Sequence, residues 1–150
     1  MSTPDTISLL NRLIVAEKNG ESALRAAAEE AHHDDLRDAL MEYSRFFAAS
    51  ARELQDAVRA LGGTPAALGT FGNTLHRTWM HLKAAALGRD ERVILDEVES
   101  DESTAEALLA DAVTWDTPPH IQALLKRQYE GARQRHQAVR RWRQQLDRAA

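Results

Sequence analysis

Apolar residues recur at steps of three and four along most of this chain, and this spacing constrains its fold more than any other sequence feature. Such spacing places the apolar side chains on one face of a helix. No stretch alternates between apolar and polar residues in the way that a half-buried strand does. The sequence therefore predicts an all-α fold in which each helix buries one face.

Glycine, proline and short polar turns mark the ends of the first two predicted helices. Thr3-Pro4 supplies an N-cap residue followed by a good first helical residue. Asp34 or Asp35 can cap the second helix. The run Gly62-Gly63-Thr64-Pro65 ends that helix, because glycine favours helix C-termini and proline cannot continue a helix.

The same signals delimit the second half of the chain. Asp90 can cap a third long helix, and Thr117 followed by Pro118 predicts the start of a fourth. We expect a single domain over residues 1–150. Its long helices are predicted at residues 4–31, 35–61, 90–115 and 118–148, with a shorter helix at 71–87.

The lengths of the connections predict how these helices are arranged. Short turns near residues 33 and 117 make the first and last pairs of helices antiparallel. The long connection over residues 64–89 can return the chain to its starting end, which leaves the second and third long helices parallel. A long helical crossover of this kind predicts a ferritin-like four-helix bundle.

Several kinds of activity and location are excluded or disfavoured by what the sequence lacks. The chain has no cysteine, which excludes disulfides, thiolate metal sites and thiol catalysis. It has no phosphate-binding loop, dinucleotide fingerprint, nucleophile elbow or His-Glu-x-x-His motif, so we favour a protein that is not an enzyme and name no catalytic residue. Its apolar runs are too short to span a membrane, and no signal peptide is recognised, so we expect a cytoplasmic location.

Polar residues that interrupt the apolar faces are the candidate functional residues. They are Glu17 and Glu21 on the first helix, Glu42 beside the stripe of the second, Glu97 and Asp101 on the third, and Gln128 and His136 on the fourth. Counting from the turns places Glu21, Glu42, Glu97 and His136 within about one helical turn of one layer. Carboxylates and imidazole suit iron or manganese, so these four residues form a candidate metal site.

The same residues also support a protein without a metal. A complete di-metal site in such a bundle uses two Glu-x-x-His repeats. Here Arg45 follows Glu42 by three residues and Arg133 precedes His136 by three, so both repeats are broken. We therefore expect no cofactor, with iron or manganese binding as the alternative.

Charge is distributed unevenly along the chain. Residues 126–150 contain eight Lys and Arg against two Asp and Glu, whereas the whole chain has a net charge of −4. We expect this basic helix to pair with the acidic remainder of the same chain or of a second subunit, and the protein to form a homodimer. Nucleic-acid binding is a less favoured alternative, because few aromatic residues accompany the basic ones.

Three motifs carry a resemblance to a known family. They are Leu75-His76-Arg77-x-Trp79-x-x-Leu82-Lys83, Ile94-Leu95-x-Glu97-x-Glu99-x-x-Glu102, and Arg127-Gln128-Tyr129 followed by His136. Together with Glu53-Leu54 and Leu61-Gly62-Gly63-x-Pro65, they resemble a family of small bacterial ferritin-like four-helix-bundle proteins that is known as a domain of unknown function. The resemblance runs over nearly the whole chain.

The resemblance implies a fold more than an activity. Related ferritin-like bacterial proteins are often tied to stress responses, which implies a non-catalytic, stress-associated structural or interaction role for this chain. Ser100-Asp101 stands where Arg-Gly is expected between the family's glutamates, so Asp101 is a feature of this chain.

Overall fold

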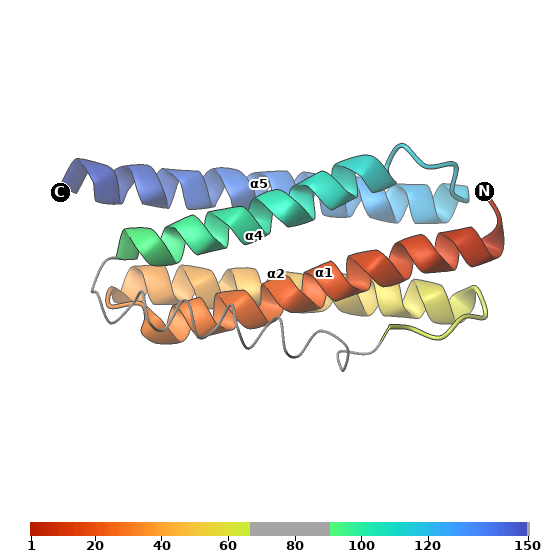
Figure 1. Cartoon of the computed structure of the whole chain (residues 1–150), viewed down its shortest axis with the longest axis horizontal. Coiled ribbons are helices and arrows are strands. Elements are labelled where there is room, and N and C mark those ends of the chain that lie inside the picture. The colour runs from red at the N-terminus through yellow and green to blue at the C-terminus, as the bar shows by residue number, and fades with distance from the viewer. Residues whose placement is uncertain (67–90, 150) are drawn as a thin grey trace.

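Over residues 1–66 and 91–149, which the computed structural model describes, the chain forms four helices and no strand (Figure 1). They are α1 (Thr3–Glu30), α2 (Asp34–Ala60), α4 (Glu91–Ala112) and α5 (Pro119–Ala149). The prediction of an all-α four-helix bundle is therefore confirmed. The short helix predicted at residues 71–87 and the predicted cap Asp90 lie outside the described residues.

Contacts at the two ends of the bundle fix the directions of the helices. The backbone N–H groups of His32 and His33 donate to Glu91 Oε1 at 3.0 and 3.2 Å, so α2 and α4 begin at the same end. The amino group of Met1 lies 3.6 Å from Asp116, in the turn between α4 and α5. Figure 1 shows the result, in which α2 and α4 run in the same direction and each helical hairpin is antiparallel.

Two apolar clusters fill the interior and are separated by a polar layer. The cluster near the α1–α2 turn includes Leu24, Leu36, Phe47, Ile94 and Val139. The cluster at the opposite end includes Leu10, Leu54, Leu109, Ile121 and Leu125. On α1 and α5, the residues between the two clusters include Glu17 and Arg135, which are both buried. The middle of the bundle is therefore charged.

The first two helices begin one residue earlier than their predicted caps imply. Ser2, not Thr3, is the N-cap of α1, because its hydroxyl accepts the Asp5 N–H at 3.2 Å. The N-cap of α2 is His33, and the His33 side chain makes no capping hydrogen bond. Asp34 and Asp35 lie in the first turn, where their negative charge interacts favourably with the helix dipole.

The ends of α2 and α4 show one correct and one wrong prediction. Gly62 has a φ of +85°, and the N–H groups of Gly62 and Gly63 donate to the carbonyls of Arg59 and Val58. This pattern is a Schellman motif, so the predicted glycine cap is confirmed. By contrast, α4 stops at Ala112 instead of residue 115, because the N–H groups of Thr114 and Trp115 donate to carbonyls only three residues back.

The start of α5 lies one residue later than predicted. The helix begins at Pro119, and the N–H of Gln122 donates to the carbonyl of Pro118, which therefore precedes the helix. The hydroxyl of Thr117 donates to Gln122 Oε1 at 3.0 Å.

Candidate functional site

Three charged side chains from three helices meet in the middle of the bundle. Glu17 on α1 is 2% exposed, Glu102 on α4 is fully buried and Arg135 on α5 is 8% exposed. Nε of Arg135 lies 3.7 Å from Oε2 of Glu102. The remaining helix, α2, contributes Phe47, whose ring centroid lies 4.8 Å from Cζ of Arg135. We call Glu17, Glu102 and Arg135 the central cluster.

A glycine lets the Phe47 ring reach this position. A Cβ atom on Gly20 would lie 2.8–2.9 Å from three atoms of the ring, which is closer than real side-chain contacts allow. Gly20 therefore brings the backbone of α1 against α2 and holds the ring where it faces Arg135. The ring that faces the guanidinium is thus positioned by a close contact between two other helices.

Burial controls the protonation of the central cluster. Burial raises the pKa of Glu17 to about 8 and that of Glu102 to about 7, although the positive charge of Arg135 opposes both shifts. Within the described part of the chain, Glu17 Oε2 and both carboxylate oxygens of Glu102 have no hydrogen-bond partner. One guanidinium can balance one carboxylate, so near neutral pH the second acid retains a proton.

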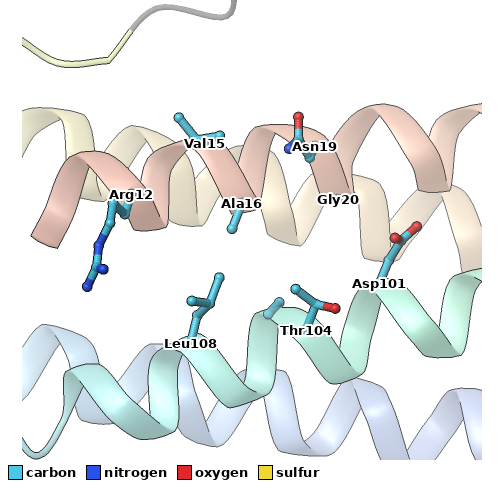
Figure 2. Close-up of a pocket in the computed structure, with 9 residues that line it drawn as sticks. Arg12, Val15, Ala16, Asn19, Gly20, Asp101, Thr104 and Leu108 are labelled. Atoms are coloured by element: carbon cyan, nitrogen blue, oxygen red, sulfur yellow. The ribbon is translucent and has the colours of Figure 1, made fainter. Parts of the chain in front are cut away.

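A cavity of about 280 Å³ lies between α1 and α4 near the central cluster. Figure 2 shows Asp101 extending from α4 towards α1 at one end, and Arg12 extending from α1 towards α4 at the other. Burial and the nearby charge of Glu97 raise the pKa of Asp101 to about 7. Gly20 also borders this cavity, within one helical turn of Glu17.

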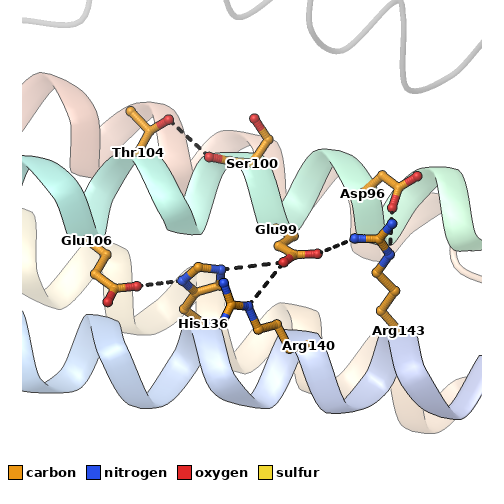
Figure 3. Close-up of polar contacts among 8 residues, drawn as sticks. All are labelled: Asp96, Glu99, Ser100, Thr104, Glu106, His136, Arg140 and Arg143. Atoms are coloured by element: carbon orange, nitrogen blue, oxygen red, sulfur yellow. Dashed lines mark hydrogen bonds and ion pairs between the residues drawn. The ribbon is translucent and has the colours of Figure 1, made fainter.

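A second cluster of polar side chains joins α4 to α5, on the side of α4 that faces α5 (Figure 3). Nδ1 of His136 lies 2.5 Å from Glu106 Oε2, and its Nε2 lies 3.6 Å from Glu99 Oε1. Arg140 and Arg143 donate to Glu99 at 3.3 and 2.7 Å. Burial alone would raise the pKa of Glu99, but the hydrogen bonds from the two arginines keep it below its ordinary value.

The predicted metal residues other than His136 have separate surroundings. Glu21 lies 3.1 Å from Arg25 and 3.8 Å from Lys18, in ion pairs along α1. Glu42 is exposed on α2, and Glu97 is half-buried on α4. Within the described residues, no hydrogen bond or ion pair links any two of the four predicted ligands.

Across residues 1–66 and 91–149, no group of three or more His, Cys, Asp or Glu side chains is arranged to hold a metal ion. The site formed by Glu21, Glu42, Glu97 and His136 stays a prediction. Of the other polar residues placed on the apolar faces, Glu17 and Gln128 are buried, whereas Asp101 is half-buried.

Sequence reasoning missed Glu102 and Arg135 as core residues. The helical spacing of apolar residues pointed to both positions. Glu102 follows Ile94 and Val98 at four-residue steps, and Arg135 lies between the buried residues Ala132 and Val139. A one-residue error in the register of α4 put the neighbouring Asp101 in the seam instead. The arginines that break the Glu-x-x-His repeats, Arg45 and Arg133, are exposed and lie outside this layer.

The arginines of α5 pair largely with acids of the same chain, as predicted. Arg127 forms an ion pair with Glu53 of α2, and Arg133 pairs with Glu130 at 3.2 Å. Arg143 lies 2.9 Å from Asp96 and also contacts Glu99. Much of the excess positive charge of this helix is therefore balanced within the bundle.

The fold and the central cluster define a class of protein: an all-α four-helix bundle with a charged interior. Residues 5–114 match the family model described as "Domain of unknown function (DUF2383)", and the chain belongs to that family. A comparison with curated proteins finds no match. The predicted relationship to a domain of unknown function is confirmed, while its ferritin-like affiliation and bacterial origin stay predictions. None of the helices in the described ranges is long and apolar enough to cross a membrane.

Proposed function

We propose that this chain is a non-catalytic structural or interaction protein built on a ferritin-like bundle. The observation that supports this proposal is that Arg135 lies 3.7 Å from the buried Glu102 and that its charge also acts on the buried Glu17. Buried acids need a compensating positive charge. A guanidinium supplies that charge from within the chain, so the acids have a structural role without a metal ion. By analogy with ferritin-like proteins, we place this role in a cytoplasmic stress response.

The surface between α2 and α5 is the proposed contact between two copies of the chain. Phe46 is 48% exposed there, and its ring centroid lies 5.8 Å from Cζ of Arg135. Tyr43 and Trp142 are partly buried and pack against the apolar cluster near the α1–α2 turn. Aromatic residues and arginine are enriched where protein interfaces bury their central area. We therefore expect a homodimer that covers Phe46.

The homodimer is tested by measuring the molar mass of the purified chain over a wide concentration range by light scattering after gel filtration. The wild type is expected to reach twice the mass of one chain, and Phe46→Lys is expected to remain a monomer. Ala107→Lys, which adds the same charge at an exposed position of α4, is the matched control and is expected to dimerise. A wild type that stays monomeric at the highest concentration contradicts the proposed self-association.

Binding of iron or manganese by carboxylates and histidine is the second candidate, and the surroundings of His136 favour it. Glu106 contacts Nδ1, which leaves Nε2 of this buried ring facing Glu99 and without a hydrogen-bond partner in the described ranges. A carboxylate that orients the second ring nitrogen is common behind histidine metal ligands. In this second proposal Glu21, Glu42 and Glu97 are the other ligands, and the site also supports Fe(II) oxidation by oxygen.

This candidate is tested by adding Fe(II) to the protein without oxygen, then admitting oxygen and measuring the protein-bound metal. Under the non-catalytic proposal, wild type and His136→Ala retain equal, sub-stoichiometric amounts. Stoichiometric binding that is lost in His136→Ala but kept in His120→Ala, an exposed histidine on the same helix, would establish the metal protein instead.

A further inference from the structure

The cavity between α1 and α4 has space because small residues line both helices. Ala16 and Gly20 face it from α1, and Ala105 faces it from α4. Its volume of about 280 Å³ lies just below the roughly 300–1,000 Å³ of pockets for drug-sized ligands. A ligand of this cavity must therefore be small, with only a short carbon chain.

One end of the cavity offers hydrogen-bond acceptors. Asp101 Oδ2 is buried and has no hydrogen-bond partner within the described ranges. The hydroxyl of Thr104 donates to the carbonyl of Ser100, so its oxygen can still accept a hydrogen bond. A buried acceptor without a partner is costly, so a ligand with N–H donors would be stabilised by donating to Asp101.

The charge at this end favours a cation. Glu97 adds a second negative charge near Asp101, and burial of Asp101 together with that charge raises the pKa of Asp101. No ion pair to Asp101 is found in the described part of the chain, unlike the ion pairs that Glu21 and Glu99 form. A positive group bound here would gain from both carboxylates.

The opposite end and the walls restrict the rest of the ligand. Val15, Ala16, Ala105 and Leu108 give apolar walls that suit a hydrocarbon chain. The exposed guanidinium of Arg12 lies at the far end, where it stacks on Trp115 at 5.5 Å from the ring centroid. Figure 2 places Arg12 and Asp101 at opposite ends of the cavity, so Arg12 would repel a second positive charge in the ligand.

We propose that this cavity binds a short primary alkylammonium ion. Its ammonium group donates to Asp101, and its carbon chain lies along Ala16 and Ala105 towards Leu108. A metal ion fits the cavity less well, because no set of three metal-ligating side chains occurs across residues 1–66 and 91–149. The site is independent of the proposed dimer surface, which lies between α2 and α5.

The proposal is tested by titrating the full chain with n-butylammonium chloride in mildly alkaline buffer and following backbone amide signals by NMR. Saturable shifts are expected at residues 12–20 and 101–108. Asp101→Asn should weaken binding about tenfold to a hundredfold, which is the usual effect of losing one charge-assisted hydrogen bond. Asp38→Asn, which removes an exposed charge on α2, is the matched control and should bind like the wild type.

Two further comparisons separate this site from general attraction of cations to an acidic protein. Ala16→Leu fills the cavity without changing charge and should abolish the shifts. Butane-1,4-diammonium should bind less tightly than n-butylammonium to the wild type, and Arg12→Gln should remove that difference. Absence of saturable shifts in the wild type, or equal binding to wild type and Asp101→Asn, overturns the proposal.

Discussion

At the scale of single residues, the central cluster brings two acids close to one base. Glu17 was predicted to lie on a buried face because it continues a stripe of apolar residues. Glu102 and Arg135 were not predicted, because a one-residue change in helical register rotates a side chain by about 100°, and periodicity does not fix register that finely. The candidate site was thus only partly readable from the sequence, since contacts between helices decide which polar residue enters the seam.

Glu17→Gln is expected to stabilise the chain at alkaline pH. An acid whose pKa is raised on folding binds more protons in the folded state, so its contribution to stability falls as pH rises from about 4.5 to about 8. Removing the ionisable group should raise the free energy of unfolding by roughly 1–4 kcal/mol above pH 8, with little change near pH 4. Urea unfolding at several pH values measures this difference.

Glu21→Gln is the control for that measurement. Glu21 lies on the same helix but pairs with Arg25 and Lys18 near the surface, where an ion pair contributes about 0–1 kcal/mol. Its substitution should therefore change stability by less than about 1 kcal/mol at any pH. A Glu17→Gln protein that is no more stable than wild type at pH 9 would show that Glu17 is not held protonated by burial.

At the scale of helices, the sequence predicted where three of the four long helices begin and end to within one residue. The turn at Gly62 and the boundary before Pro119 were readable because glycine and proline restrict the backbone locally. The N-cap of α2 could not be predicted from local sequence, because the His33 N–H donates to Glu91, which comes from a distant part of the chain. Local signals set most ends, and contacts between helices set the remainder.

Gly20→Ala is expected to destabilise the chain even though alanine is the better helix former. The added Cβ would lie 2.8 Å from the Phe47 ring, and such overpacking costs about 1–3 kcal/mol. Gly131→Ala on α5 is the matched control, because its new Cβ meets only the end of the Arg135 side chain, at 3.4 Å. That control should be neutral or stabilising by up to about 1 kcal/mol.

Thermal unfolding followed by circular dichroism compares the two glycine variants. A double variant, Gly20→Ala with Phe47→Leu, should regain part of the stability because the smaller side chain makes room for the Cβ. If Gly20→Ala unfolds at a higher temperature than wild type, the close contact between α1 and α2 does not restrict this position.

At the scale of the whole molecule, the net charge of −4 conceals a basic helix packed on an acidic remainder. Three arginines of α5 each pair with an acid of another helix, so their positive charges are already balanced and are less able to bind a polyanion. They are Arg127, Arg140 and Arg143. Nucleic acid would have to displace these pairs as well as overcome the overall negative charge. The exposed Phe46 surface is therefore better suited to association than the basic face of α5.

We expect the chain not to be retained on immobilised duplex DNA at physiological salt. Any binding at low salt should disappear as salt is raised, because phosphate contacts weaken steeply with ionic strength. A column run at several salt concentrations measures this. Retention at physiological salt that weakens in Arg141→Gln would make nucleic acid the leading partner.

The connection of the helices as two hairpins also determines when the buried charges meet during folding. α1 and α2 are joined by a short turn, as are α4 and α5, so each hairpin can form early from local contacts. Glu102 and Arg135 belong to the same hairpin and can pair before the two hairpins meet. Glu17 arrives only when they associate and must lose its hydration at that step. We therefore expect the rate of hairpin docking to depend on whether Glu17 already carries a proton.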